Sequence, residues 1–322
     1  MTALQALRAY RPSTGGSVLT LGNFDGVHRG HQRLVQTACR RSRECGAAAL
    51  AVTFDPHPLA LLAPQRAPAA LMTVAERRWH LLRAGADEVL VLPTSRDLLE
   101  LDAIQFVEEI VRCCRPRGFV EGPSFRFGRG RGGSNETLAS LAERHGYFVD
   151  VVDEWRSAPD AEPVSSSAIR AVLGEGDVAV AALGLGRPHR LTGVVESGQG
   201  RGGPLGFPTA NLGRIAQSAP AHAVYAAVAQ LADGALWPAA VNIGPQPTFS
   251  QETSCVEAHL IGFAGELRGA MLGLHLVRRL RGQIRFDGIE ALRSQLQSDL
   301  RQAREAAAAT MAALASSELP PL

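Results

Sequence analysis

Lysine is missing from the sequence: all 33 residues counted as lysine plus arginine are arginine. This absence excludes a lysine Schiff base and a Walker A phosphate loop, whose lysine contacts the β and γ phosphates of a nucleotide. The five cysteines show neither paired CxxC spacing nor the density of a disulfide scaffold, so we expect reduced thiols in a cytoplasmic protein. Any phosphate site must rely on groups other than lysine.

Long apolar runs and an excess of one charge are also missing. No apolar run is long enough to span a membrane, and the first residues lack a basic region followed by an apolar stretch, so we expect no membrane association. The net charge is only +2, with acids and arginines interleaved, and we expect no nucleic-acid partner. A chain of 322 residues is long enough for two domains with a core each. Nothing in this pattern indicates an oligomeric state.

The first half of the sequence predicts a parallel β-sheet wrapped by helices, because apolar runs alternate with amphipathic segments. Candidate strands lie at 17–21, 47–54, 88–92, 118–122 and 148–152. Candidate helices lie at 34–43, 75–83, 103–114 and 136–145, and Gly146 follows the last of them as a stop signal.

Short β runs punctuated by Gly, Pro and Asp-Gly replace this pattern after two short helices within 164–188. We place the boundary near Arg187, which gives expected domains at 1–186 and 187–322. The pair Asp233-Gly234 between two apolar runs predicts a type I′ hairpin. The last amphipathic segment, 288–302, predicts a helix that packs across a small β-barrel.

The segment LGNFDGVHRGH, Leu21–His31, predicts a strand end, a loop and a helix start that binds phosphate. Backbone N–H groups and the positive end of the helix dipole point at such a loop and favour an anion such as a triphosphate. Three glycines allow the backbone to approach it closely: Gly22, Gly26 and Gly30.

Two histidines of this segment, His28 and His31, are spaced to project from one side of a helix. Two imidazole donors on one phosphate suit nucleotidyl transfer, in which charge develops on phosphoryl oxygens and no protein nucleophile is required. Two alternatives stay open: a surface turn with incidental histidines, and a metal site completed by Asp25 and His57.

GNFDGVHRGH resembles the HxGH nucleotidyltransferase signature in the form carried by bacterial bifunctional riboflavin kinase/FMN adenylyltransferases, also called FAD synthetases. Three further segments match that family in order: TFDPHP (53–58), FRFGRGRGG (125–133) and VSSSAIR (164–170). The resemblance implies ATP contacts from Gly22, Asn23, Phe24, Asp25, Gly26, His28, Gly30, His31, Ser165, Ser166, Ser167 and Arg170. It implies flavin contacts from Phe54, Pro56, His57, Pro58, Phe125, Arg126 and Gly128.

Plainer interpretations exist for two of these segments. One serine of VSSSAIR would suffice as a helix cap, and GRGRGG would serve as a flexible loop. GRGRGG also approximates GxGxxG, but it is not a dinucleotide fingerprint, because it lies late in the domain among arginines instead of at the first strand-to-helix turn.

In the second half, GQGRGGPLGFPTANL, 198–212, resembles the GxPTAN motif of riboflavin kinases. The resemblance implies ATP contacts from Gly206, Pro208, Thr209 and Asn211, with Thr209 and Asn211 holding Mg²⁺, an ion that favours hard oxygen ligands. It implies that Glu257 is the base for the riboflavin 5′-hydroxyl and that Arg281 approaches the flavin phosphate. On the residues alone, an outward-facing Glu257 and a solvated Arg281 remain alternatives.

The resemblance covers nearly the whole chain and implies a Rossmann-like α/β nucleotidyltransferase domain followed by a Greek-key β-barrel kinase domain with a C-terminal helix. The expected reactions are riboflavin and ATP to FMN, and FMN and ATP to FAD and pyrophosphate. Alternatives are adenylation of another phosphorylated small molecule, and a flavin-binding regulatory protein without transferase activity. The chain departs from the family pattern at Pro123-Ser124, Ser134, Ser167, Ala223 and Gln283.

Overall fold

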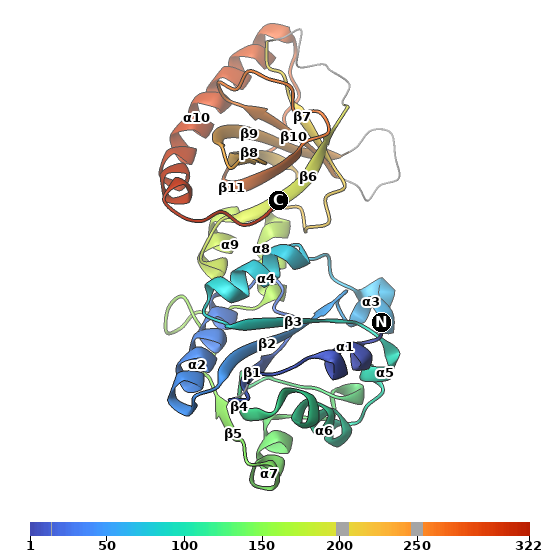
Figure 1. Ribbon diagram of the computed structural model, residues 1–322. Coiled ribbons are helices and arrows are strands. Elements are labelled where there is room, and N and C mark those ends of the chain that lie inside the picture. Colours follow the sequence, from blue (N-terminus) through green and yellow to red (C-terminus); the bar gives the residue numbers. More distant parts are fainter. Residues whose placement is uncertain (14, 198–205, 246–253) are drawn as a thin grey trace. The chain divides into compact units, whose positions relative to one another are not determined.

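The structure is a computed structural model that describes residues 1–13, 15–197, 206–245 and 254–322 (Figure 1). The chain forms two compact units: unit 1 comprises Met1–Pro68 and Val74–Val164, and unit 2 comprises Ala69–Thr73 and Ser165–Leu322. The domain boundary that we expect near Arg187 stays a prediction.

Unit 1 contains a five-stranded sheet in the order β3-β2-β1-β4-β5, and every described pair of strands is parallel. The strands are β1 (Ser17–Leu21), β2 (Ala48–Asp55), β3 (Glu88–Pro93), β4 (Pro116–Glu121) and β5 (Phe148–Val151). All five match the predicted strands. Because β2 and β4 lie on opposite sides of β1, the strand order reverses at β1 and β4, where such sheets leave a crevice beyond their carboxyl ends.

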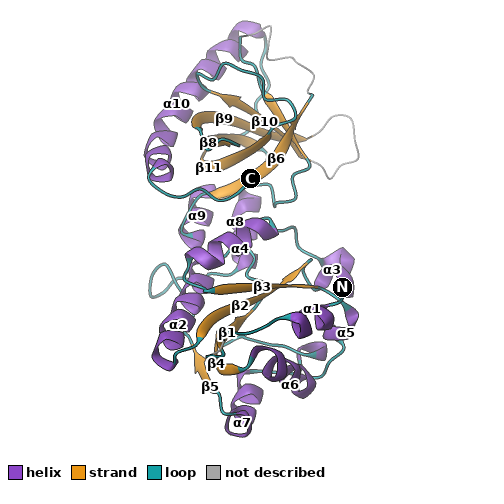
Figure 2. Ribbon diagram, viewed as in Figure 1, coloured by secondary structure: helices purple, strands orange, loops and turns teal. Residues whose placement is uncertain are grey.

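Helices cover both faces of this sheet (Figure 2). They are α1 (Ala3–Ala9), α2 (Arg29–Cys45), α3 (Leu59–Leu62), α4 (Val74–Arg83), α5 (Arg96–Leu99), α6 (Ala103–Cys114) and α7 (Asn135–His145), with 3₁₀ turns at Pro64–Arg66 and Arg129–Arg131. The helix predicted at 34–43 begins five residues earlier, at Arg29, because His28 caps it. Gly146 ends α7 in the left-handed conformation, as predicted.

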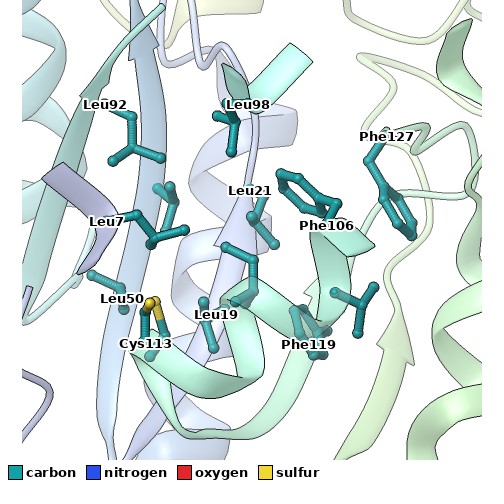
Figure 3. Packing of buried hydrophobic residues seen from close by; sticks show 14 of the residues in the cluster. Leu7, Leu19, Leu21, Leu50, Leu92, Leu98, Phe106, Cys113, Phe119 and Phe127 are labelled. Carbon is teal, nitrogen blue, oxygen red and sulfur yellow. The ribbon is translucent and has the colours of Figure 1, made fainter. Parts of the chain in front are cut away.

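Successive side chains of β1 point to opposite faces of the sheet, so this strand contributes to a hydrophobic core on each face. Leu19 and Leu21 pack with Phe106 and Phe119 on the face covered by α1 and α6 (Figure 3). Val18 packs with residues of α2 on the opposite face. Every β1 residue is buried, as expected for a central strand covered on both sides.

Unit 2 contains a closed antiparallel barrel in the order β10-β7-β6-β11-β8-β9. The strands are β6 (His189–Glu196), β7 (Ala210–Gly213), β8 (Ala223–Leu231), β9 (Leu236–Pro245), β10 (Ser254–Leu260) and β11 (Met271–Arg281). The predicted hairpin joins β8 to β9, but the prediction of a type I′ turn was wrong. Gly234 has a φ of 85° whereas Asp233 does not lie in the left-handed region, so the loop is a three-residue turn ending in a left-handed glycine.

Three helices complete unit 2: α8 (Ser166–Glu175), α9 (Val178–Leu185) and α10 (Ile289–Ala315). Helix α10 packs on β8 and β9 through small side chains, with Ala303 against Ala226 and Ala240. It extends beyond the predicted 288–302 because the Ala-rich segment after it has high helix propensity. Among the described residues, no helix is both long and apolar enough to cross a membrane.

Candidate active sites

The loop between β1 and α2 is tightly folded and mostly buried. Phe24, Gly26 and Val27 have φ values of 47°, 83° and 37°, so three residues lie in the left-handed region within four positions. Only Gly26 adopts it without steric cost. Phe24 is 1% exposed and the Val27 N–H donates to its carbonyl oxygen (3.0 Å), which fixes the turn. Burial thus stabilises a backbone that is unfavourable by itself.

His28 and His31 meet at the start of α2. His28 Nδ1 accepts from the His31 backbone N–H (3.4 Å) and so caps the helix. The two rings stack with centroids 3.6 Å apart and an interplanar angle of 20°, and Phe24 lies edge-on to His31 at 5.2 Å. The expected placement of both imidazoles on one side of the helix start is confirmed. Because His28 Nδ1 is an acceptor, its Nε2 carries the proton.

The charge of His31 is controlled by its surroundings. Burial lowers the pKa of His31 well below its usual value, and the nearby His28 and Arg77 lower it further. His31 is therefore a neutral imidazole, which still donates one hydrogen bond. Its Nδ1 is buried and has no hydrogen-bond partner among the described residues.

His57, at the end of β2, holds Asn23 of the same loop. The Leu59 N–H donates to His57 Nδ1 (3.1 Å). The Asn23 side-chain nitrogen, Nδ2, lies 2.9 Å from His57 Nε2. Both ring nitrogens of His57 are thus engaged.

The metal alternative for this loop finds no support. In the part of the chain that the structure describes, no group of three His, Cys, Asp or Glu side chains is arranged to hold a metal ion. The loop is instead lined by backbone and imidazole donors, which suit an anion.

Glu121, which ends β4 at the reversal of strand order, was missed by the sequence analysis. It is 1% exposed, and its Oε1 accepts from the Leu21 N–H at the end of β1 (2.8 Å). Burial raises the pKa of Glu121 well above its usual value, and the hydrogen bond from the Leu21 N–H acts in the opposite direction. Its position, an acidic residue at the end of a predicted strand, was the feature of the sequence that could have marked Glu121 as a site residue.

The predicted flavin loop after β4 is an ordered hairpin. Phe127 and Gly133 exchange two backbone hydrogen bonds of 3.1 and 2.9 Å. The rings of Phe125 and Phe127 stack at 5.4 Å, and Phe127 also packs against Phe106 of α6. Arg126 is exposed and Gly128 has a φ of 71°. Hydrogen bonds and ring contacts therefore close the loop on itself and on α6.

The other predicted flavin residues lie around the end of β2. Phe54, His57 and Pro58 are half-buried, Pro56 is exposed, and the Asp55–Pro56 peptide bond is cis.

The serine motif begins unit 2. Ser165 Oγ accepts from the Ala168 N–H (3.1 Å) and caps α8, so the cap interpretation holds for this serine. Arg170 Nε donates to the Ala69 carbonyl oxygen (2.7 Å). Contact of Ser165, Ser166, Ser167 and Arg170 with ATP stays a prediction.

The barrel aligns the predicted kinase residues by strand register. Glu257 on β10 lies directly opposite Asn211 on β7 and opposite Asn242 on β9. Directly opposed residues share one face of a sheet, with Cβ atoms about 4.5–5.5 Å apart. Thr209 is exposed just before β7. Glu257 is half-buried, and its neighbours on β10, Val256 and Ala258, are each 1% exposed, so Glu257 lies on the outer face of the barrel beside the two amides. The outward-facing glutamate of the plainer interpretation therefore agrees with the structure.

Asn242 was missed by the sequence analysis, although it lies in the segment NIGPQPTF. Gln283 Nε2 donates to Asn242 Oδ1 (2.8 Å) and to the Ile243 carbonyl oxygen (3.0 Å). Gln283, a departure from the family pattern, therefore orients this amide. Residues 198–205 of the glycine-rich motif and 246–249 of NIGPQPTF lie outside the described residues.

Arg281 is held by an internal acid. Its guanidinium contacts Asp299 of α10, with Nη2 to Oδ2 at 2.7 Å and Nε to both oxygens at 3.1 Å. Asp299 is 2% exposed, whereas the Arg281 side chain is 18% exposed. Arg281 thus links β11 to α10 and is not a solvated strand end; its contact with a flavin phosphate stays a prediction.

Family models match both parts of the chain. The one for FAD synthetase matches residues 11–168, and the one for riboflavin kinase matches residues 185–307. A bifunctional riboflavin kinase/FMN adenylyltransferase of Escherichia coli (strain K12) is 34% identical over 90% of this chain and 92% of that protein. The protein so named from Bacillus subtilis (strain 168) is 32% identical over 89% of this chain and 91% of its own length.

A solved structure from Streptococcus pneumoniae, described as a macrolide-efflux protein, matches with a TM-score of 0.82 and 26% identity. It covers 91% of this chain and 95% of that one. This likeness supports the fold across both units and contributes nothing further about activity.

The first prediction concerns the buried carboxyl group of Glu121. Because its folded pKa is raised, the folded protein keeps a proton that the unfolded chain releases above a pH of about 4.5. The free energy of unfolding therefore falls as pH rises above that value. Glu121→Gln keeps the acceptor for Leu21 but cannot ionise, so its thermal unfolding midpoint should fall less between pH 5 and pH 8. The exposed Glu143→Gln is the control, and equal pH profiles for all three proteins would contradict the assignment.

The second prediction concerns the Arg281–Asp299 pair. Asp299→Ala leaves the Arg281 guanidinium without its acid and should destabilise the barrel by about 3 kcal/mol, the lower end for buried pairs, since Arg281 keeps some solvent contact. Urea unfolding measures the loss, and hydrogen exchange of β11 and α10 locates it. Glu290→Ala removes an exposed acid from the same helix and should leave the unfolding midpoint nearly unchanged. Similar midpoints for the two variants would show that the buried pair contributes nothing.

Proposed function

This chain belongs to the family of bifunctional riboflavin kinase/FMN adenylyltransferases, and we propose an assignment of its residues to the two reactions. The enzyme phosphorylates riboflavin to FMN with ATP, and adenylates FMN to FAD with a second ATP. Enzymes of this family generally use a divalent metal ion with ATP, and we propose Mg²⁺. The kinase reaction is assigned to 187–322 and the adenylyl transfer to 1–186. The use of ATP and the free thiols of the five cysteines support a cytoplasmic enzyme.

Adenylyl transfer is assigned to the loop between β1 and α2. A phosphate oxygen of FMN attacks the α-phosphorus of ATP, and the bond to the leaving pyrophosphate breaks. The positive end of the α2 dipole, at the start of this helix, stabilises the phosphates. The neutral His31 and the Nε2–H of His28 donate to oxygens on which charge develops. The stacked imidazole pair at the helix start is the observation that carries this assignment.

The remaining contacts of this reaction follow the family motifs. Ser165, Ser166, Ser167 and Arg170 contact ATP phosphates, where hydroxyl and guanidinium groups are suitable donors. The flavin is held by the end of β2 and by the loop after β4, through Phe54, Pro56, His57, Pro58, Phe125, Arg126 and Gly128. The stacked Phe125 and Phe127 rings support an aromatic ligand at that loop.

Riboflavin phosphorylation is assigned to the row of residues across β7, β10 and β9. Glu257 accepts the proton of the 5′-hydroxyl as that oxygen attacks the γ-phosphorus of ATP, and the bond from this phosphorus to the leaving ADP breaks. Thr209 and Asn211 hold Mg²⁺, with Gly206 and Pro208 beside the nucleotide, and the hard oxygen donors of both side chains fit this ion. Arg281 contacts the flavin phosphate, with Asp299 fixing its guanidinium. The register that opposes Glu257 to Asn211 carries this assignment.

The third prediction separates the two reactions with one variant each. Glu257→Gln should lower FMN formation by about 10²–10⁴-fold while FAD formation from supplied FMN continues. His31→Ala should lower FAD formation from FMN by about 10²–10³-fold while riboflavin phosphorylation continues. Chromatography of the flavins after incubation with ATP and Mg²⁺ measures both. If either variant lost both activities, or neither, the division of residues between the reactions would be wrong.

The fourth prediction tests the metal ligand against the base. Chelation of divalent ions should stop FMN formation, and added Mg²⁺ should restore it. Asn211→Ala should raise the Mg²⁺ concentration needed for half-maximal FMN formation by about tenfold or more, whereas Glu257→Gln should lower kcat at an unchanged Mg²⁺ requirement. If Asn211→Ala lowered kcat but needed the same Mg²⁺ concentration as the wild type for half-maximal FMN formation, the assignment of Asn211 as a metal ligand would be wrong.

A further inference from the structure

Arg77 of α4 is a buried cation next to the adenylyl-transfer loop, and no family motif quoted above includes it. It is 5% exposed. Its Nη1 donates to the Phe54 carbonyl oxygen (2.7 Å) and to Thr53 Oγ1 (3.3 Å), both at the end of β2. Its Nε is buried without a hydrogen-bond partner among the described residues.

These contacts continue into the loop. The Thr53 hydroxyl that accepts from Arg77 donates to the Asn23 carbonyl oxygen (3.0 Å). The Asn23 side chain is held in turn by His57, which follows β2. The guanidinium therefore contacts the end of β2 directly and is linked through Thr53 to Asn23, two residues after the end of β1.

The electrostatic surroundings of Arg77 include both burial and acidic side chains. Burial lowers the pKa of Arg77, and the nearby carboxylates of Asp25 and Asp55 act in the opposite direction. Arginine stays charged under such conditions. A buried cation is costly unless an anion and hydrogen bonds compensate it, and a triphosphate at the loop would supply further negative charge. The same charge helps to keep the His31 imidazole neutral.

We propose that Arg77 is a positioning residue for adenylyl transfer: it holds the Asn23 backbone against β2 and supplies positive charge behind the loop that receives the triphosphate. This inference rests on the proposed assignment of FMN adenylylation to that loop. Arg77 acts through Asn23 and its neighbours and does not itself touch the reacting atoms.

The test compares three single variants in FMN adenylylation, with kcat and the KM for ATP measured on the full chain with Mg²⁺. Arg77→Met should lower kcat about 100-fold, because misplacement of a binding loop by about 1 Å is enough for such a loss. Arg77→Lys keeps the charge and one donor and should recover part of it. Arg78→Met removes a charge from the exposed neighbour on the same helix and should behave as wild type.

Riboflavin phosphorylation by the same molecules checks that unit 2 is folded, and the thermal midpoint of unit 1 sets a temperature at which unit 1 of each variant is folded. A merely structural Arg77 would lower that midpoint and leave kcat of the folded protein unchanged, which overturns the inference. Failure of Arg77→Lys to exceed Arg77→Met also overturns it. His31→Ala distinguishes failure of the Arg77 inference from failure of the proposed function. If this variant keeps its FMN adenylylation activity, the assignment of that reaction to the loop has failed.

Discussion

The first unit depends on one constraint: the chain must turn from β1 into α2 within seven residues while remaining buried. Phe24 and Val27 adopt left-handed backbone conformations that their side chains disfavour, and only the packing around them compensates this cost. The His28 cap, the Asn23–His57 contact and the Thr53 hydroxyl all anchor this turn. A loop that is fixed before any ligand arrives presents its N–H groups to an anion without a further loss of conformational entropy.

Much of the fold was readable from the sequence because the apolar pattern is strong. The five strands of unit 1 were predicted since each is a short apolar run, and the barrel was predicted from short runs with turn signals. Element ends were harder. Helix α2 begins at Arg29 because of a side-chain cap by histidine, which is not among the residues usually favoured at that position. The turn at Asp233-Gly234 is set by the length of the hairpin loop, which the dipeptide alone does not determine.

Some residues of the candidate sites could be predicted from the sequence, and others could not. Residues that lie in one continuous motif, such as His28 and His31, were identified because local spacing places them together. Asn242 and Glu121 were missed because each becomes part of a site only through a neighbouring strand: Asn242 through its register with Glu257, and Glu121 through Leu21. Such pairings depend on tertiary structure and leave no short-range pattern. Asp299 was missed for the same reason, since its partner is 18 residues away on another element.

Because the sequence contains no lysine, the side chains with a permanent positive charge in both units are arginines. A lysine ammonium on a flexible stem can follow a moving phosphate, whereas the planar guanidinium of arginine binds best when its direction is fixed. Three of the arginines considered at the sites are held by a protein acceptor: Arg77 by the Phe54 carbonyl, Arg170 by the Ala69 carbonyl and Arg281 by Asp299. A guanidinium carries five N–H donors, so one anchoring contact leaves others for a ligand. The protein thus obtains positive charge that is oriented before a ligand binds.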